Sequence, residues 1–289
     1  MFRLPAPRLF QAMTDPSRPR PPAASRRLPG RALCTACIRI LRRGLSALAL
    51  AVLPWPAQAG EVLVAVAANF AEVLAQLKPD FERRSGHTLV ATTGSTGKLY
   101  AQIKAGAPFQ VLLAADAQTP RRLEQEGLAV PGSRRTYALG QLALWSRTPG
   151  LWGDDGTAYL QAGRMRHLAI ANPELAPYGV AARETLQALG AWAAVRDKVV
   201  MGQNIGQVHA LVASGAAEAG FVALSAVRSP RQSATGSLWI VPGRLHEPIV
   251  QQAVLLMRGK DEPAARALLD YLKTDEARRT IASWGYGVE

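Results

Sequence analysis

The two segments Ala65-Val66-Ala67-Ala68-Asn69-Phe70 and Gly94-Ser95-Thr96-Gly97-Lys98-Leu99-Tyr100 decide how this chain folds. Each is a run of small, hydroxyl or amide residues that lies between an apolar strand and a helical pattern. The start of a helix carries backbone N–H groups without an intrahelical partner, and the helix dipole favours negative charge there. Two such helix starts that converge would hold an oxyanion without any formal positive charge.

Strand and helix patterns alternate along the rest of the chain. Two alternating units of about 100 residues each imply two α/β lobes with mostly parallel strands. The expected elements of the first unit are Glu61–Ala67, Phe70–Arg84, His87–Thr93, Thr96–Ala105, Val111–Ala115 and Thr119–Glu126. Those of the second unit are His167–Ala171, Gly179–Leu189, Lys198–Met201, Ile205–Ala213 and Ala219–Leu224. A late strand, Leu238–Val241, and two helices follow, Asp261–Lys273 and Asp275–Ser283.

Two longer strand-like runs, Thr136–Ser146 and Ile249–Met257, are the expected crossings between the lobes. We therefore expect lobe one to comprise residues 60–142 together with 250–289, and lobe two to comprise residues 143–249. The return of the chain to lobe one is an expectation that the pattern alone does not require.

Residues 1–59 differ from the rest of the chain and read as a leader. They hold ten arginines and a single acid, Asp15, so most of the net charge of +13 comes from this segment. The charge therefore gives no reason to expect a nucleic-acid partner. Basic residues at Arg39–Arg43, the apolar run Leu45–Leu53 and the small-residue motif Ala57-Gln58-Ala59 have the order of a signal peptide. We predict cleavage after Ala59 and export to the periplasm. The apolar run is too short to span about 30 Å of hydrocarbon.

The candidate binding residues lie at four strand-to-helix turns. Asn69 and the pair Ser95-Thr96 stand at the first two turns, Tyr178 follows Pro177 at a third, and Ile205 opens a fourth. Each residue alone is equally consistent with an ordinary helix cap or a core side chain. Four similar turns spread over both lobes are stronger together, because ligands of α/β sheets bind beyond the carboxyl ends of the strands.

Catalysis and direct metal binding find less support in the sequence. Ser95-x-x-Lys98 matches the first motif of serine acyl-enzymes, but the partner motifs of that class are missing. The four histidines are scattered, and no His or carboxylate cluster has metal-ligand spacing. Both cysteines, Cys34 and Cys37, belong to the leader and would leave with it. The sequence therefore predicts no catalytic residue, no cofactor and no directly ligated metal.

The combined motifs resemble those of the periplasmic molybdate-binding proteins of ABC transporters. The resemblance covers almost all of residues 61–289. The combination of motifs is specific to this family, although no single motif is. The segments that carry it are Ala67–Phe70, Gly94–Ile103, Gly106–Phe109, Ala114–Asp116, Ala171–Pro173, Ala176–Gly179, Gln203–Gln207 and Gly220–Ser225.

This resemblance implies a two-lobed type II periplasmic-binding-protein fold, in which each lobe is a mixed sheet flanked by helices. It also implies a tetrahedral dianion, molybdate or tungstate, held between the lobes and delivered to an ABC permease by a monomeric protein that is not an enzyme. The residues carried over as ligands are Asn69, the backbone near Ala68, Ser95 or Thr96, Tyr178 and the backbone around Ile205.

Two departures from the family pattern affect the expected site. A family subgroup has Ser or Thr in the first loop, where this chain has Ala68-Asn69, and others have a Tyr where this chain has Ala223. We therefore expect the first loop to act through Asn69 and backbone N–H groups, and the Tyr178 hydroxyl to replace the missing one.

Competing interpretations remain open at this point. The anion could be another one, such as sulfate, or the chain could be the sensing domain of a regulator or an acyl-enzyme. A site made only of donors suits a fully deprotonated anion, because hydrogen phosphate would leave its proton unpaired at a cost of about 1–3 kcal/mol.

Overall fold

The computed structural model describes residues 59–228 and 235–288, which lie in one compact unit, Pro56–Glu289. The predicted leader and signal peptide, apart from Ala59, fall outside the described residues. Within the described ranges, no helix combines the length and the apolar character that a membrane crossing requires.

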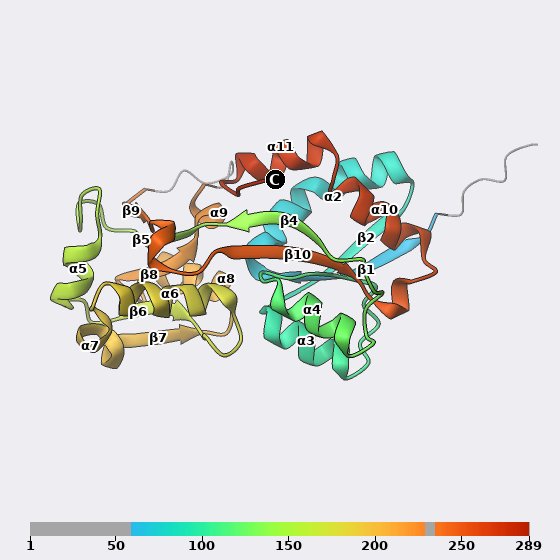
Figure 1. Cartoon of the computed structure of the whole chain (residues 1–289). Coiled ribbons are helices and arrows are strands. Elements are labelled where there is room, and N and C mark those ends of the chain that lie inside the picture. Colours follow the sequence, from blue (N-terminus) through green and yellow to red (C-terminus); the bar gives the residue numbers. More distant parts are fainter. Residues whose placement is uncertain (1–58, 229–234, 289) are drawn as a thin grey trace, which may run out of the picture. The chain divides into compact units, whose positions relative to one another are not determined.

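Two five-stranded mixed sheets form the framework, one in each lobe (Figure 1). Lobe one, defined here by the sheet of order β2-β1-β3-β10-β4, has parallel pairs β1–β2 and β1–β3 and antiparallel pairs around β10. Its strands are β1 (Glu61–Ala67), β2 (Thr88–Gly94), β3 (Val111–Leu113), β4 (Arg135–Gly140) and β10 (Ile249–Leu255). Its helices are η1 (Ala68–Phe70), α2 (Ala71–Ser85), α3 (Thr96–Lys104), α4 (Gln118–Gln125), η4 (Met257–Gly259), α10 (Pro263–Tyr271) and α11 (Asp275–Ser283).

Lobe two is defined here by the sheet of order β7-β6-β8-β5-β9. Its strands are β5 (Leu142–Ser146), β6 (Leu168–Ala171), β7 (Val199–Gly202), β8 (Ala219–Ala223) and β9 (Ser237–Ile240). Its helices are α5 (Thr157–Ala162), α6 (Pro177–Ala188), α7 (Trp192–Val195), η2 (Arg196–Lys198), α8 (Ile205–Ala213), α9 (Leu224–Val227) and η3 (Gly243–Leu245). The helices α6 and α8 pack against this sheet.

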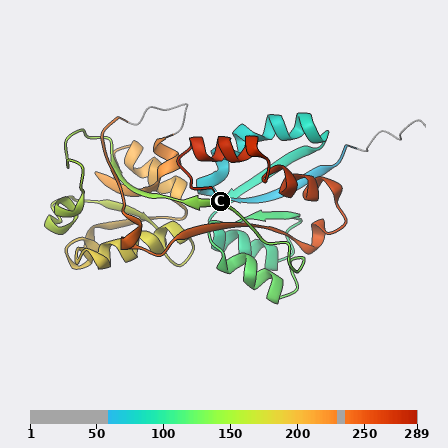
Figure 2. The ribbon, with the colours of Figure 1, turned by 45° about the horizontal axis from the view of Figure 1, so that its top comes forward.

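Both faces of the sheet in lobe one are covered, and the alternation of β1 shows how. Val62, Val64 and Val66 join the core under α2, α10 and α11, whereas Ala65 faces a second core that includes residues of α3 and α4. Figure 2 shows these two groups of helices on opposite sides of the strands. Because side chains alternate across a strand, a strand buried on both faces is apolar along its whole length.

The crossings between the lobes differ from the sequence prediction. The run Thr136–Ser146 is not one strand: β4 ends at Gly140 in the first sheet, and β5 begins at Leu142 in the second. β10 lies wholly in the first sheet, and its first residue, Ile249, pairs with Gly140. The chain therefore crosses between the lobes twice, near Gln141 and just before Ile249, and the two crossings lie side by side. Figure 1 shows β4 and β10 running next to each other there. The prediction of one long strand was wrong because the interruption Gly140-Gln141, where the chain changes sheet, was not recognised as the end of a strand.

Candidate functional site

A small cavity lies where four helices begin. It is bounded by the starts of η1, α3, α6 and α8, two from each lobe. The centre of a water-sized sphere reaches only about 10 Å³ within it, so the space between these helix starts is narrow. The residues that line it are Ala67, Ala68, Asn69, Gly94, Ser95, Thr96, Ala115, Ala176, Pro177, Tyr178, Asn204 and Ile205. All six residues that the sequence singled out are among them.

The Ser95 hydroxyl is the group in the cavity wall that points most directly to a ligand. Ser95 is the N-cap of α3 and is 3% exposed. Its side chain does not cap its own helix, and its Oγ has no hydrogen-bond partner among the described residues. A buried hydroxyl without a partner costs about 1–3 kcal/mol, so such groups are rare in folded proteins. A ligand oxygen in the cavity would supply the missing partner.

The first N–H groups of three helices also border the cavity. Thr96 is the first residue of α3 and Ile205 the first residue of α8. In α6 the first residue is Pro177, which has no N–H, so the first N–H of that helix belongs to Tyr178. These groups have no acceptor within their own helix, and the helix dipoles add positive potential at the same place. The Thr96 hydroxyl has a structural partner as well, because it accepts a bond of 3.1 Å from the Ala115 N–H.

Asn69 lines the cavity, but its side-chain N–H groups point elsewhere. Its Nδ2 donates to Gln251 Oε1 at 2.8 Å and to the Tyr286 hydroxyl at 3.0 Å. The Asn69 backbone carbonyl in turn accepts from the hydroxyls of Tyr286 and Ser225, at 2.7 and 3.2 Å. These bonds hold the backbone of the first loop, residues 67–70, and orient its N–H groups.

Sequence reasoning missed this supporting layer behind the cavity. Gln251, Tyr286 and Ser225 are buried, and Gln251 and Tyr286 lie 182 and 217 residues from Asn69 along the chain. The one available signal is the pair Gln251-Gln252 inside an otherwise apolar strand. No local pattern connects that pair to Asn69.

None of the described residues that line the cavity has a charged side chain. Lys98 is exposed and is not among the lining residues, although it lies within the first turn of α3. The Ser95-x-x-Lys98 motif therefore does not place a base in the cavity, which removes support from the acyl-enzyme interpretation. Among the described residues there is also no group of three His, Cys, Asp or Glu side chains that could hold a metal ion.

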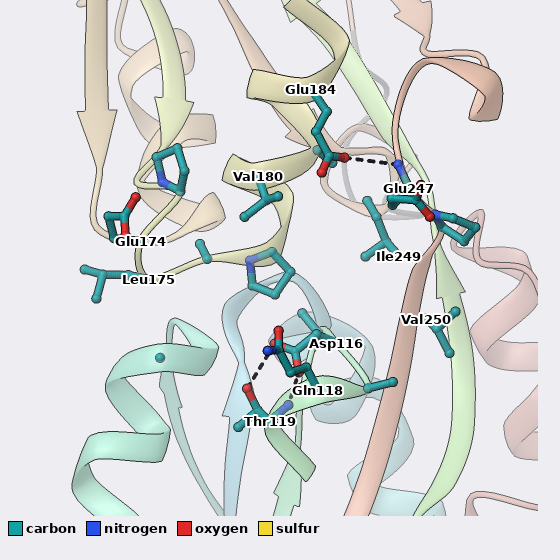
Figure 3. A pocket seen from close by; sticks show the side chains of 18 residues that line it. Asp116, Gln118, Thr119, Glu174, Leu175, Val180, Glu184, Glu247, Ile249 and Val250 are labelled. Atoms are coloured by element: carbon teal, nitrogen blue, oxygen red, sulfur yellow. Dashed lines mark hydrogen bonds between the residues drawn. The ribbon is translucent and has the colours of Figure 1, made fainter. Parts of the chain in front are cut away.

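A larger hollow of about 460 Å³ adjoins this cavity and shares Ala115, Ala176 and Pro177 with it. Figure 3 shows its wall, in which Glu184 accepts from the Glu247 N–H at 3.0 Å and Asp116 accepts from Thr119. Burial raises the pKa of Asp116 above its ordinary value, although the Thr119 bonds oppose the shift. Among the described residues that line the hollow there are acids and no basic residue, so it is not itself suited to an anion.

Comparison with known proteins gives consistent matches. Residues 62–287 match the family described as "Bacterial extracellular solute-binding protein". The chain is 50% identical over 249 residues to the molybdate-binding protein ModA of Azotobacter vinelandii, covering 86% of this chain and 98% of that protein. It is 47% identical over 250 residues to ModA of Rhodobacter capsulatus, covering 86% and 97%. The structure of the periplasmic molybdate-binding protein of Azotobacter vinelandii superposes with a TM-score of 0.76 and 40% identity, covering 79% of this chain and 99% of that one.

Proposed function

This chain belongs to the bacterial extracellular solute-binding proteins, and we propose that it captures molybdate, or the similar anion tungstate, in the cavity between its lobes. The names of the relatives at 50% and 47% identity support this ligand. In the proposal, the anion accepts hydrogen bonds from the Ser95 hydroxyl and from the N–H groups of the first loop, Thr96, Tyr178 and Ile205.

The observation that carries the proposal is the Ser95 hydroxyl, which has no hydrogen-bond partner among the described residues and lies in a cavity that four helix starts bound. The described residues that line this cavity are uncharged. Every group proposed to face the ligand is a donor, and none is a cation. A dianion without protons can accept from all of them at once. Hydrogen phosphate would bring a proton for which the wall offers few acceptors, and an unpaired polar group costs about 1–3 kcal/mol.

The roles proposed for individual residues differ from the sequence expectation in two respects. We assign the Asn69 contribution to the backbone N–H groups of its loop, because its side-chain amide donates to Gln251 and Tyr286. We assign Tyr178 a backbone N–H contact, because this is the first N–H of α6, and its hydroxyl meets Gln251 Nε2 at 3.1 Å behind the cavity. Ser95 is then favoured over Thr96 as the hydroxyl donor.

The setting of this function is proposed from the same family. The exported protein would act as a monomer in the periplasm, without catalysis or a cofactor, and pass its anion to the permease of an ABC importer. The two lobes would close on the anion by turning about the two adjacent crossings of the chain near Gln141 and Ile249.

Isothermal titration of the protein purified from the periplasm tests this proposal. Molybdate and tungstate should bind at one site per chain, about 100-fold or more tightly than sulfate or phosphate, which corresponds to about 2.7 kcal/mol. Tight sulfate binding with weak molybdate binding would establish the alternative anion. Absence of saturable binding by all four anions would overturn the proposal.

A further inference from the structure

Gln251 joins the two lobes directly behind the anion cavity. It is 0% exposed, and its amide oxygen accepts from Asn69 Nδ2 at 2.8 Å and from the Tyr137 hydroxyl at 2.9 Å, both in lobe one. Its amide nitrogen donates to the Tyr178 hydroxyl in lobe two at 3.1 Å. One side chain therefore connects both walls of the cavity without lining it.

Gln251 also stands at the place where the chain passes between the lobes. The pairing of β10 with β4 shifts register between Gln251 and Gln252, and Ile249 pairs with Gly140 at the end of β4. A Cβ atom on Gly140 would lie 2.4 Å from the Tyr178 hydroxyl and 2.6 Å from Gln251 Nε2. The bond between Gln251 and Tyr178 is thus packed against Gly140, at the first crossing of the chain between the lobes. A relative rotation of the lobes would change the length of this bond.

The hydroxyl groups of this network stay neutral over the working pH range. Burial raises the pKa of Tyr137 and of Tyr178 well above the ordinary value, and raises that of Tyr286 to about 12. The network is therefore held by hydrogen bonds between uncharged groups, whose strength depends on geometry and hardly on salt. Neutral bonds of this kind rigidify a site when all members are satisfied.

We propose that Gln251 is a positioning residue for anion binding: it holds the Asn69 loop and the start of α6 at Tyr178 in the spacing that the closed cavity requires. The inference rests on the proposed function. Without the Gln251 amide, three buried groups lose a partner, and the N–H donors on the two walls are no longer held in register. Anion affinity then falls although no group that faces the anion has changed.

The primary test compares Gln251→Met with Gln252→Met, in titrations with molybdate. The adjacent glutamine is a matched control because its side-chain contacts are long, 3.4 Å from Arg134 and 3.5 Å to Thr136. We expect Gln251→Met to weaken molybdate binding about 30-fold or more, and Gln252→Met to change it less than about threefold. Equal effects of the two substitutions, or wild-type affinity in Gln251→Met, would overturn the inference.

A double-mutant cycle with Tyr178→Phe separates positioning from a general loss of packing. Tyr178→Phe removes the bond that Gln251 makes to lobe two but leaves the contacts of Gln251 within lobe one. Because both substitutions break the same bond, the double variant should bind molybdate more tightly than the product of the single effects predicts. Fully multiplicative losses in variants that remain folded by circular dichroism would show that Gln251 does not act through Tyr178.

The variant Gln251→Glu adds a readout that packing alone would not change. Its ionised carboxylate can only accept from Tyr178 and adds a negative charge behind the cavity, whereas its protonated form can donate to Tyr178 as the Gln251 amide does. Burial near an anion raises the pKa of a carboxyl group. The affinity deficit relative to wild type should therefore shrink as the pH falls from about 8.5 to about 5.5. The nearby carboxyl group of Asp116, whose charge acts on Tyr137, is present in both proteins and cancels in the ratio. A deficit that does not vary with pH would argue against the inference.

These measurements distinguish the inference from the proposed function. If wild type fails to bind molybdate but binds sulfate, the proposed ligand is wrong, and the same variants are titrated with sulfate. If wild type binds molybdate and Gln251→Met binds it equally well, the proposed function stands and the positioning role does not.

Discussion

The backbone N–H of Gly97 in lobe one donates a hydrogen bond of 2.9 Å to the carbonyl oxygen of Leu175 in lobe two. Gly97 is the second residue of α3, so one of the free N–H groups at this helix start is directed to the opposite lobe and not to the cavity. This bond lies beside the anion cavity, because both residues also line the adjoining hollow.

The close approach at this bond predicts the effect of Gly97→Ala. A Cβ atom on Gly97 would lie 3.1 Å from the Leu175 oxygen and 3.2 Å from its Cα, which is tighter than ordinary contact. We expect the lobes to close incompletely and molybdate to bind about tenfold more weakly, about 1.4 kcal/mol. Titration calorimetry measures this loss. Gly153→Ala is the control, because a Cβ there meets nothing within 4 Å, and an equal loss in the control would refute the steric explanation.

Replacing Ser95 by Ala should separate binding from stability. Hydrogen bonds to charged groups contribute about 1.5–3 kcal/mol, so molybdate affinity should fall about tenfold to a hundredfold. The melting temperature of the ligand-free protein should not fall, since the Ser95 hydroxyl has no partner among the described residues. Lys98→Met is the control for charge and should change the affinity little. A large loss for Lys98→Met with normal affinity in Ser95→Ala would point instead to a cationic pocket.

Asn69→Ala should behave differently from Ser95→Ala. The Asn69 side chain donates to Gln251 and Tyr286, so its removal leaves buried partners unsatisfied even without ligand. We expect a lower melting temperature of the ligand-free protein together with a tenfold to hundredfold loss of molybdate affinity, by about 1.4–2.7 kcal/mol. Thermal denaturation with and without molybdate measures both effects. Unchanged stability would mean that the network behind the cavity contributes little.

The buried carboxyl group of Asp116 should make the stability of the folded protein depend on pH. Burial raises its pKa in the folded protein, so the folded state binds the proton more tightly than the unfolded state does. The ionised carboxyl group therefore destabilises the fold at neutral pH, and this penalty disappears as the pH falls through the raised pKa. Asp116→Asn keeps an acceptor for the Thr119 N–H and should raise the melting temperature at pH 7, with the gain shrinking toward about pH 4.

Asp155 offers a control of opposite sign for this measurement. It accepts from the Thr157 N–H and hydroxyl, and these bonds lower its pKa. Its stabilising contribution is present above the unfolded pKa and is lost as the pH falls through the folded one. Asp155→Asn should therefore lower the melting temperature slightly at pH 7. A gain in both variants would show that general surface charge, and not burial of Asp116, sets the effect.

The predicted end of the leader can be checked directly by N-terminal sequencing. The order of basic, apolar and small residues at Arg39–Ala59 predicts a mature protein that begins at Gly60. N-terminal sequencing of the periplasmic protein measures the start. A start more than a few residues from Gly60, or recovery from the cytoplasm alone, would contradict the assignment.

The sequence predicted the fold well where information is local. The expected strand Glu61–Ala67 and helix Asp275–Ser283 have the bounds of β1 and α11, and the two-lobed α/β class is confirmed. Periodicity and helix-start residues carry that information within a few turns of chain. The short helices α5 and α7 were missed, because 6 and 4 residues are too few for a helical period to emerge.

The candidate site was predictable in part for the same reason. Helix starts can be read from Asn69, Ser95, Tyr178 and Ile205, so the lining of the cavity could be foreseen. Which atoms are free to meet an anion could not, because that depends on partners such as Gln251 and Tyr286, far away in the chain. The sequence expectation of an Asn69 side-chain donor overlooked those partners.

The bond between Tyr286 and the Asn69 carbonyl joins residues that are 217 positions apart in the sequence. Because contacts so distant in sequence form only after the intervening chain has been brought together, the first loop reaches its final geometry late in folding. The anion cavity is therefore completed only when the C-terminal segment has packed onto lobe one.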